Sequence, residues 1–142
     1  MRFVDLAPGD ARLTSDVFPV LKELRTSLTA EQFSDVYSEG HPQGLRFTAA
    51  YDGESCVGVA GWRLMATTVA GRKLYVDDLV TAVGQRGRGV GSALLSELQR
   101  RAREAGCTAI DLDSGTSRED AHRFYFRERM TITSLHFARA LT

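Results

Sequence analysis

The chain has 142 residues, of which 43% are hydrophobic, and its 18 basic and 18 acidic side chains cancel in formal charge. This length fits a single domain over residues 1–142 that is large enough to bury a core without disulfides. The zero net charge gives no general attraction to nucleic acid or to an anionic membrane, so neither is expected as a partner.

The first predicted elements are a short strand and two helices. Alternating residues over Arg2 to Leu6 stop at a Pro-Gly pair, which predicts a strand ended by a turn. Apolar residues at helical spacing predict a helix over Ser15 to Leu28. A capping-box pattern, Thr29 with Gln32 three residues later, predicts a second helix from Ala30 to near Glu39.

Three strands joined by short turns are predicted next. The first, Leu45 to Tyr51, is followed by the hairpin signal Asp52-Gly53 and then by a strand over Cys56 to Met65. A second turn at Ala70-Gly71 precedes a strand over Lys73 to Thr81. Turns this short predict an antiparallel meander.

Helices and strands alternate in the last third of the chain. Apolar residues over Leu94 to Ala105 mark one helix face, and Gly106 follows at the position of a helix C-terminal glycine. A short buried strand is predicted over Ala109 to Leu112. Another helix is predicted to begin at Ser117, which has an acidic residue three positions later, and a closing strand is predicted over Ile132 to Leu141.

These elements give the order β, α, α, β, β, β, α, β, α, β. The unit from Lys73 to Leu112 is a strand–helix–strand crossover, so its two strands are expected to be parallel. We therefore expect an α/β (α+β) domain with a mixed, mostly antiparallel central sheet flanked by helices.

Targeting and metal-binding signals are not found in the sequence. The first residues, MRFVDLAPGD, lack the apolar region of a signal peptide, and no apolar run approaches the length of about 18 residues that spans a bilayer. The three histidines lie far apart and pair with no cysteine at a metal-ligand spacing. We expect a cytoplasmic protein whose site contains no metal.

The stretch QRGRGVGSALL joins a predicted strand to a predicted helix. A helix N-terminus leaves about four backbone N–H groups unpaired and carries positive partial charge. Side chains that would keep an anion away are absent at Gly87, Gly89 and Gly91, which also permit positive φ. Forked donors are added by Arg86 and Arg88. Together these features predict a phosphate cradle made chiefly of backbone amides.

Other uses of such a loop are weighed against this one. A nucleoside-triphosphate loop is excluded because no Gly-Lys-Ser/Thr occurs. The dinucleotide fingerprint fails at its last position, Ser92 counted from Gly87, although Asp111 or Asp113 lies near the spacing of a ribose-binding acid. An oxidoreductase with a nucleotide cofactor therefore stays open. A tight turn that merely begins a helix is the remaining alternative, and the two arginines count against it.

Two motifs carry a resemblance to a known family. Residues Arg86 to Gly91, RGRGVG, match the pattern R-x-x-G-x-G/A, and Ala121 to Tyr125, AHRFY, match A-x-x-F-Y about thirty residues later. With these two motifs in this order, the chain resembles the GNAT superfamily of acyl-CoA-dependent N-acyltransferases over most of its length. Two positions depart from the family pattern: Arg118 stands where an asparagine is frequent, and Arg129 stands where a glycine is usual.

The resemblance implies a GNAT-like fold and an enzymatic activity. The enzyme would transfer an acyl group, with acetyl as the expected group, from acetyl-CoA to an amine, and it would need no metal. By position, the resemblance implies that the pantetheine arm is held by the backbone of Leu79, Val80 and Thr81. It likewise implies a pyrophosphate site formed by Arg86, Gly87, Arg88, Gly89, Val90, Gly91 and Ser92. Tyr125 matches the family tyrosine that donates to the coenzyme A sulfur, and would protonate the leaving thiolate.

The candidates for the general base are Asp77 and Asp78. Neighbours on a regular strand point to opposite faces, so the two carboxylates cannot share a proton unless a bulge intervenes. We slightly favour Asp77, since acidic residues here in relatives can face the cleft; a structural role for both is the alternative. An aspartate with an ordinary pKa near 3.9 is a weak base for an ammonium ion, so burial or a water relay must assist it.

The acceptor stays open among a small amine, an amino acid, an antibiotic and a protein terminus. If the resemblance holds, the acceptor wall is formed by the first two helices with Tyr37 and His41-Pro42. The alternative function is a non-catalytic GNAT-like module that binds acyl-CoA as a sensor or regulatory partner. Whether the chain forms a homodimer also stays open.

Overall fold

The computed structural model describes all 142 residues, and its sheet has five strands in the order β1-β2-β3-β4-β5. The strands are β1 (Arg2–Leu6), β2 (Arg46–Asp52), β3 (Ser55–Thr67), β4 (Gly71–Thr81) and β5 (Ala109–Leu112). The pairs from β1 to β4 are antiparallel, whereas β5 follows β4 through a helical crossover and lies beside it. The mixed, mostly antiparallel sheet expected from the sequence is therefore confirmed.

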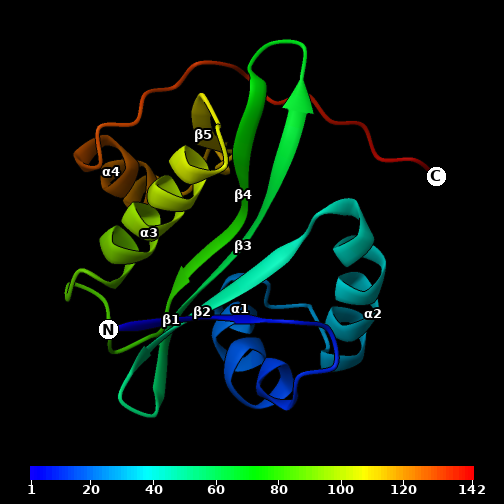
Figure 1. Ribbon diagram of the computed structural model, residues 1–142, viewed down its shortest axis with the longest axis vertical. Helices are drawn as coiled ribbons and strands as arrows, with labels where there is room; N and C mark the ends of the chain where they lie inside the picture. The colour runs from blue at the N-terminus through cyan, green and yellow to red at the C-terminus, as the bar shows by residue number, and fades with distance from the viewer. The chain divides into compact units, whose positions relative to one another are not determined.

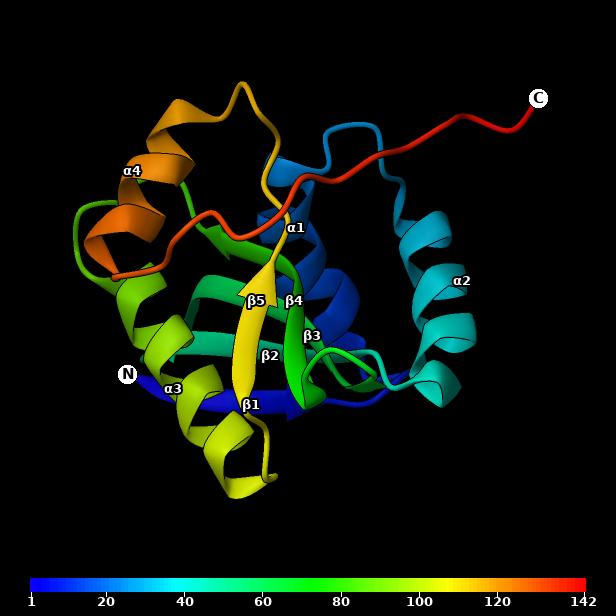
Figure 2. The ribbon, with the colours of Figure 1, turned by 90° about the horizontal axis from the view of Figure 1, so that it is seen from above.

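The helices are α1 (Phe18–Leu24), α2 (Ala30–Gly40), α3 (Val90–Glu104) and α4 (Glu119–Arg127), with a π-helical turn at Leu13–Val17 and a 3-10 turn at His41–Gln43. The chain forms two compact units, Met1–Asp111 and Leu112–Thr142, and the single-domain interpretation stays a prediction. In the first unit α1 and α2 lie on one face of the sheet and α3 lies on the other (Figures 1 and 2). None of the helices is long and apolar enough to cross a lipid bilayer.

The main core lies between the sheet and the pair α1 and α2. Phe33 and Tyr37 of α2 are buried there, and each ring meets Phe47 of β2 edge to face. The Tyr37 hydroxyl donates to the Leu6 carbonyl at 2.6 Å and accepts the Phe47 N–H at 3.3 Å. This hydroxyl thus joins α2 to two strands and fixes the helix over the sheet.

The opposite face of the sheet is covered by the apolar stripe of α3. Its buried residues are Val90, Leu94, Leu95, Leu98 and Ala102. A Cβ atom at Gly58 of β3 would lie 2.7 Å from Val90 Cγ1 and 2.8 Å from Leu94 Cδ1. Glycine at position 58 therefore lets the first turn of α3 pack directly on the sheet, which anchors the loop that precedes the helix.

Several local predictions are confirmed. Thr29 and Gln32 form the reciprocal capping box at the start of α2. Gly106 ends α3 with a φ of 77°, and the Cys107 N–H bonds to the Ala102 carbonyl at 2.9 Å, as a helix-ending glycine requires.

The structure corrects the predicted boundaries of two helices. The first helix ends at Leu24 rather than Leu28, because Arg25 leaves helical geometry (φ −102°, ψ 74°) and its side chain bonds to β4. The last helix begins at Glu119 after Arg118, without the side-chain cap that was expected from Ser117.

The predicted closing strand over Ile132 to Leu141 is wrong. Residues 131–142 belong to no strand, and the side chains of Ile132, Leu135 and Phe137 are exposed. A pattern of alternating apolar residues gives a segment one face that can pack in a sheet. A strand forms only if a neighbouring strand is also available to pair with it. These residues have no such pairing in the structure.

Candidate active site

A β-bulge places both acidic residues of β4 in one pocket. Gly61 of β3 pairs with Asp78 and the next residue, Trp62, pairs with Val76, so Asp77 is an extra residue on β4. A bulge re-aims the side chains around it, and both aspartates line the same hollow. The prediction that Asp77 and Asp78 point to opposite faces of the sheet is therefore wrong. It held for a regular strand, and the bulge is the exception that the sequence analysis allowed.

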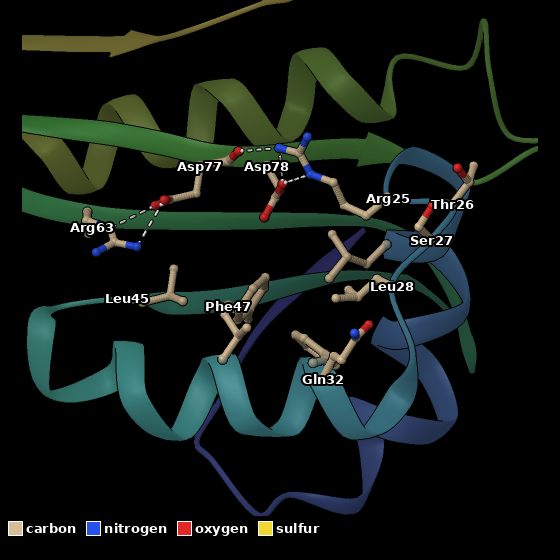
Figure 3. Close-up of a pocket in the computed structure, with 13 residues that line it drawn as sticks. Arg25, Thr26, Ser27, Leu28, Gln32, Leu45, Phe47, Arg63, Asp77 and Asp78 are labelled. Atoms are coloured by element: carbon tan, nitrogen blue, oxygen red, sulfur yellow. Dashed lines mark hydrogen bonds and ion pairs between the residues drawn. The ribbon is translucent and has the colours of Figure 1, made fainter. Parts of the chain in front are cut away.

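The pocket has a volume of about 700 Å³ and lies between α2 and the sheet (Figure 3). Its polar lining consists of Arg25, Thr26, Ser27, Gln32, Arg63, Asp77 and Asp78, and its apolar lining consists of Leu21, Leu28, Phe33, Val36, Leu45 and Phe47. This volume is within the range of small-molecule sites, roughly 300 to 1,000 Å³.

Each aspartate has an arginine of its own. Arg63 of β3 holds Asp77 with a fork: Nε donates to Oδ2 and Nη2 to Oδ1, both at 3.0 Å. Arg25, which follows α1, donates from Nε to Asp78 Oδ1 at 2.8 Å, and its Nη2 forms an ion pair with the same oxygen at 2.6 Å. Its Nη2 also donates to the Asp77 carbonyl at 3.2 Å.

Asp78 Oδ2 differs from the other three carboxylate oxygens of the pair, because it accepts no arginine hydrogen bond. A Cβ atom at Gly61 would lie 3.2 Å from Oδ2 and 2.8 Å from Phe47 Cε1, so glycine leaves the room that this carboxylate occupies. Figure 3 shows the oxygen directed toward the pocket.

Burial raises the pKa of Asp78 above its ordinary value, while the charge and hydrogen bond of Arg25 act in the opposite direction. The Asp78 side chain is 14% exposed and that of Arg25 is 53% exposed, so the carboxylate is the desolvated member of the pair. An accessible carboxylate oxygen with a raised pKa is suited to accept a proton.

The glycine-rich loop opens α3 with a row of unpaired amides. No N–H group of residues 86–92 donates a hydrogen bond within the chain, and the first that does is the Ala93 N–H, to the Gly89 carbonyl at 3.0 Å. Gly87 and Gly89 have φ angles of 80° and 79°, and a Cβ at either position would meet nothing within 4 Å. Positive φ is thus confirmed at two of the three glycines, while Gly91 lies within α3.

The strand β4 leads from the acidic pair to this loop. Leu79, Val80 and Thr81 pair on one side with β3 residues Ala60, Val59 and Gly58. On the other side, the contacts of β4 with the β5 region lie near its first residues, where the Thr108 N–H bonds to the Arg72 carbonyl at 2.9 Å and Lys73 pairs with Asp111 at 2.8 Å.

Tyr125 lies on α4, in the second compact unit. Its ring meets that of Phe124 edge to face, with centroids 5.3 Å apart. Burial raises the pKa of the Tyr125 hydroxyl above its ordinary value, and the charge of Arg118 acts in the opposite direction. The phenol is therefore protonated at neutral pH, as a proton donor must be.

Sequence reasoning missed the two arginines that pair with the aspartates, and it placed Tyr37 at the acceptor wall although its hydroxyl is used inside the core. Arg25 and Arg63 lie 53 and 14 residues from their partners, so no local pattern links them. The capping-box pattern predicted α2 itself, but it did not show that this helix contributes an apolar wall to a pocket.

Comparison of the chain with known proteins identifies its family. The model of the acetyltransferase (GNAT) family matches residues 12–130, so the chain belongs to that family, whose members use acetyl-CoA as co-substrate. The predicted resemblance is thereby confirmed.

Two curated relatives and one solved structure illustrate the match. The uncharacterized N-acetyltransferase YhdJ of Bacillus subtilis is 31% identical over 112 residues, which are 78% of this chain and 79% of that protein. The aminoalkylphosphonate N-acetyltransferase of Salmonella typhimurium is 38% identical over 66 residues, 46% of this chain and 43% of that protein. The ribosomal-protein-alanine N-acetyltransferase of Brucella melitensis superposes with a TM-score of 0.82 at 17% identity, covering 99% of this chain and 100% of that one.

Proposed function

We propose that the protein transfers an acetyl group from acetyl-CoA to a primary amine, by direct attack of the amine on the thioester in a ternary complex. Membership of the GNAT family supports the acyl donor. The observation that carries the proposal is the row of unpaired amides over residues 86–92 at the start of α3. Unpaired amides at a helix N-terminus bind phosphate oxygens, and coenzyme A carries a diphosphate.

The loop fits the diphosphate in shape and charge. Arg86, Gly87, Arg88, Gly89, Val90, Gly91 and Ser92 form the proposed cradle, chiefly through backbone N–H groups. The open space above Gly87 and Gly89 admits phosphate oxygens close to the chain. We assign the pantetheine arm to the backbone of Leu79, Val80 and Thr81, because a strand edge offers donors and acceptors to an amide chain.

The pocket next to this strand is the proposed acceptor site, and Asp78 rather than Asp77 is its proposed base. Both oxygens of Asp77 accept hydrogen bonds from Arg63, so neither is left to accept a proton from an amine. Asp78 keeps Oδ2 for the amine and has the raised pKa. A primary amine at pH 7 is mostly ammonium, and forming the neutral nucleophile costs roughly 4–5 kcal/mol, which a positioned base offsets.

The remaining step is departure of the thiolate. After the amine nitrogen forms its bond to the acetyl carbon, the carbon–sulfur bond breaks and the sulfur needs a proton. We propose that Tyr125 donates it, since its hydroxyl is protonated and matches the family tyrosine by position. The ammonium ion loses two protons in all. The first goes to Asp78 before the attack and from there to solvent, and the second, released from the nitrogen after the attack, restores the phenol of Tyr125 through water, so the products are the N-acetyl amine and the thiol of coenzyme A.

The test is a pair of measurements on the purified chain. Acetyl-CoA at 100 times its dissociation constant is expected to stabilise the fold by about 2.7 kcal/mol, whereas NAD and ATP produce no shift. Release of free thiol from acetyl-CoA is expected to depend on added amine. A thermal shift without amine-dependent thiol release would favour a non-catalytic acyl-CoA sensor, and a shift with NAD alone would overturn the proposal.

A further inference from the structure

We infer that the acceptor is a monoamine with an apolar body, and that the pocket disfavours polyamines. The inference rests on the proposed function, which makes this pocket the acceptor site. It names the chemical class of amine from the distribution of charge and apolar surface in the pocket.

The pocket offers a single anchor for an amine. Of the four oxygens on Asp77 and Asp78, three are engaged by arginine and only Asp78 Oδ2 is not. The other polar lining residues, Thr26, Ser27 and Gln32, carry no charge. One nitrogen of a ligand can therefore be held by a carboxylate, and a second would find none.

The charges of the lining cancel, which works against a polycation. Arg25 and Arg63 balance Asp77 and Asp78, so the pocket has no net negative charge with which to hold several ammonium groups. Each additional positive group on a ligand would lie near a guanidinium and be repelled by it.

The wall opposite the carboxylates is apolar and partly exposed. Val36 of α2 is 51% exposed, and Leu28, in the connection before α2, is half-buried. Behind them lie the buried side chains of Phe33, Leu45 and Phe47. An apolar ligand body that covers Leu28 and Val36 removes apolar surface from water, which favours binding in proportion to the area covered.

The test compares three primary amines with saturating acetyl-CoA: phenethylamine, ethanolamine and spermidine. They represent an apolar monoamine, a small polar monoamine and a polyamine. We expect kcat/KM for phenethylamine to exceed the other two values by roughly 10- to 100-fold, the effect of burying an aromatic side chain. Equal or faster turnover of spermidine or ethanolamine would overturn the inference.

Three variants test whether the apolar wall causes the preference for phenethylamine. Leu28→Asn and Val36→Asn make the wall polar from two different elements, and each is expected to lower kcat/KM for phenethylamine by roughly three- to tenfold and to lower that for ethanolamine less. Ser34→Asn is the matched control, because Ser34 is exposed on the same helix and does not line the pocket. Equal losses for both amines, or the same loss in the control, would contradict the assignment of the wall.

A binding measurement separates this inference from the proposed function. Calorimetric titration of the three amines into the coenzyme A complex needs no turnover. If thiol release is absent with every amine, the proposed transferase activity fails, whereas the order of the dissociation constants still decides the acceptor class. Phenethylamine is expected to bind most tightly, and tighter binding of spermidine would refute the inference whether or not the chain is catalytic.

Discussion

Arg25 and Asp78, 53 residues apart in the sequence, are joined by a hydrogen bond from Nε to Oδ1 of 2.8 Å at the side of the pocket. The arginine is the exposed partner and the aspartate the buried one. Because an exposed guanidinium is readily solvated, removing Arg25 changes the environment of the carboxylate more than it changes the packing. Substitution of Arg25 can therefore alter the basicity of Asp78, the proposed base, while Asp78 itself is kept.

The first prediction concerns pH dependence. Arg25 lowers the pKa of Asp78 below the value that burial alone would give. Arg25→Gln is therefore expected to move the acidic limb of the kcat/KM profile to higher pH. The control is Arg12→Gln, which breaks an exposed pair with Asp10 on another part of the surface. A limb that stays in place in Arg25→Gln would exclude Asp78 as the titrating base.

The second prediction separates the two aspartates. Burial raises the pKa of Asp78 above its ordinary value of 3.8, so the folded chain holds that proton more tightly, and this contribution to stability is lost as pH rises past 3.8. Asp78→Asn removes the cost of the buried charge, and its melting temperature at pH 7 is expected not to fall. Its kcat is expected to fall by about 100-fold or more, because the base is gone.

Asp77→Asn is the matched variant and should behave differently. It breaks the fork from Arg63, whose side chain is only 23% exposed, and leaves that guanidinium without its carboxylate. A loss of about 1–3 kcal/mol in the free energy of unfolding is expected. Urea unfolding and steady-state kinetics of both variants check the contrast; a greater loss of kcat in Asp77→Asn would exchange the two roles.

The features that the sequence predicted correctly are those determined by residues close together in the chain. The capping box at Thr29 and the helix-ending Gly106 depend on neighbours within a few positions. The glycine loop is of the same kind, since positive φ at Gly87 and Gly89 follows from the residue type and from the helix that begins next. Such features do not need the rest of the fold to be known.

The pocket could not be predicted in this way. Whether Asp77 and Asp78 share a face depends on an extra residue in the pairing of β3 with β4, which alternation along one strand does not reveal. The space for Asp78 depends on Gly61, on a different strand. The last strand failed for a related reason, because pairing is a property of two segments and the pattern over Ile132 to Leu141 describes only one.

The third prediction tests the loop. Gly89→Ala introduces a methyl group at the proposed phosphate site and strains a backbone with a φ of 79°. Gly71→Ala, at the first residue of β4, is the matched control, with a φ of 76° and the same open space around it. Both variants are expected to lose about 1 kcal/mol of stability. Only Gly89→Ala should raise KM for acetyl-CoA, by about tenfold; equal KM values in the two variants would refute the cradle.

The fourth prediction concerns the thiolate. Tyr125→Phe removes one hydroxyl and keeps the ring that packs against Phe124. The expected result is a kcat at least about tenfold lower with KM for acetyl-CoA unchanged, because only the departing sulfur uses the proton. Tyr51→Phe removes a hydroxyl that bonds to Asp16 and should leave kcat unchanged. Full turnover by Tyr125→Phe would remove the proposed role.

The fifth prediction concerns stability in acid, away from the pocket. Glu97 of α3 accepts hydrogen bonds from Arg100 at 2.6 and 3.0 Å and from Arg101 at 3.1 Å, and these arginines lower its pKa to about 2. A lowered carboxyl pKa contributes stability that is complete above the ordinary value of 4.5 and is lost as pH falls toward 2. Glu97→Gln is therefore expected to be less stable than the natural chain at pH 7, by no more than about 1 kcal/mol because solvent screens the pair.

The difference between Glu97→Gln and the natural chain should shrink as the pH is lowered from 4.5 toward 2, since protonated Glu97 and glutamine are then alike in charge. Glu104→Gln makes the same change of charge on the same helix, at a side chain that is 68% exposed and bonds only to Arg100. It should have the smaller effect at pH 7. Urea unfolding at several pH values checks both, and a difference that persists at pH 2 would show that Glu97 acts through packing rather than charge.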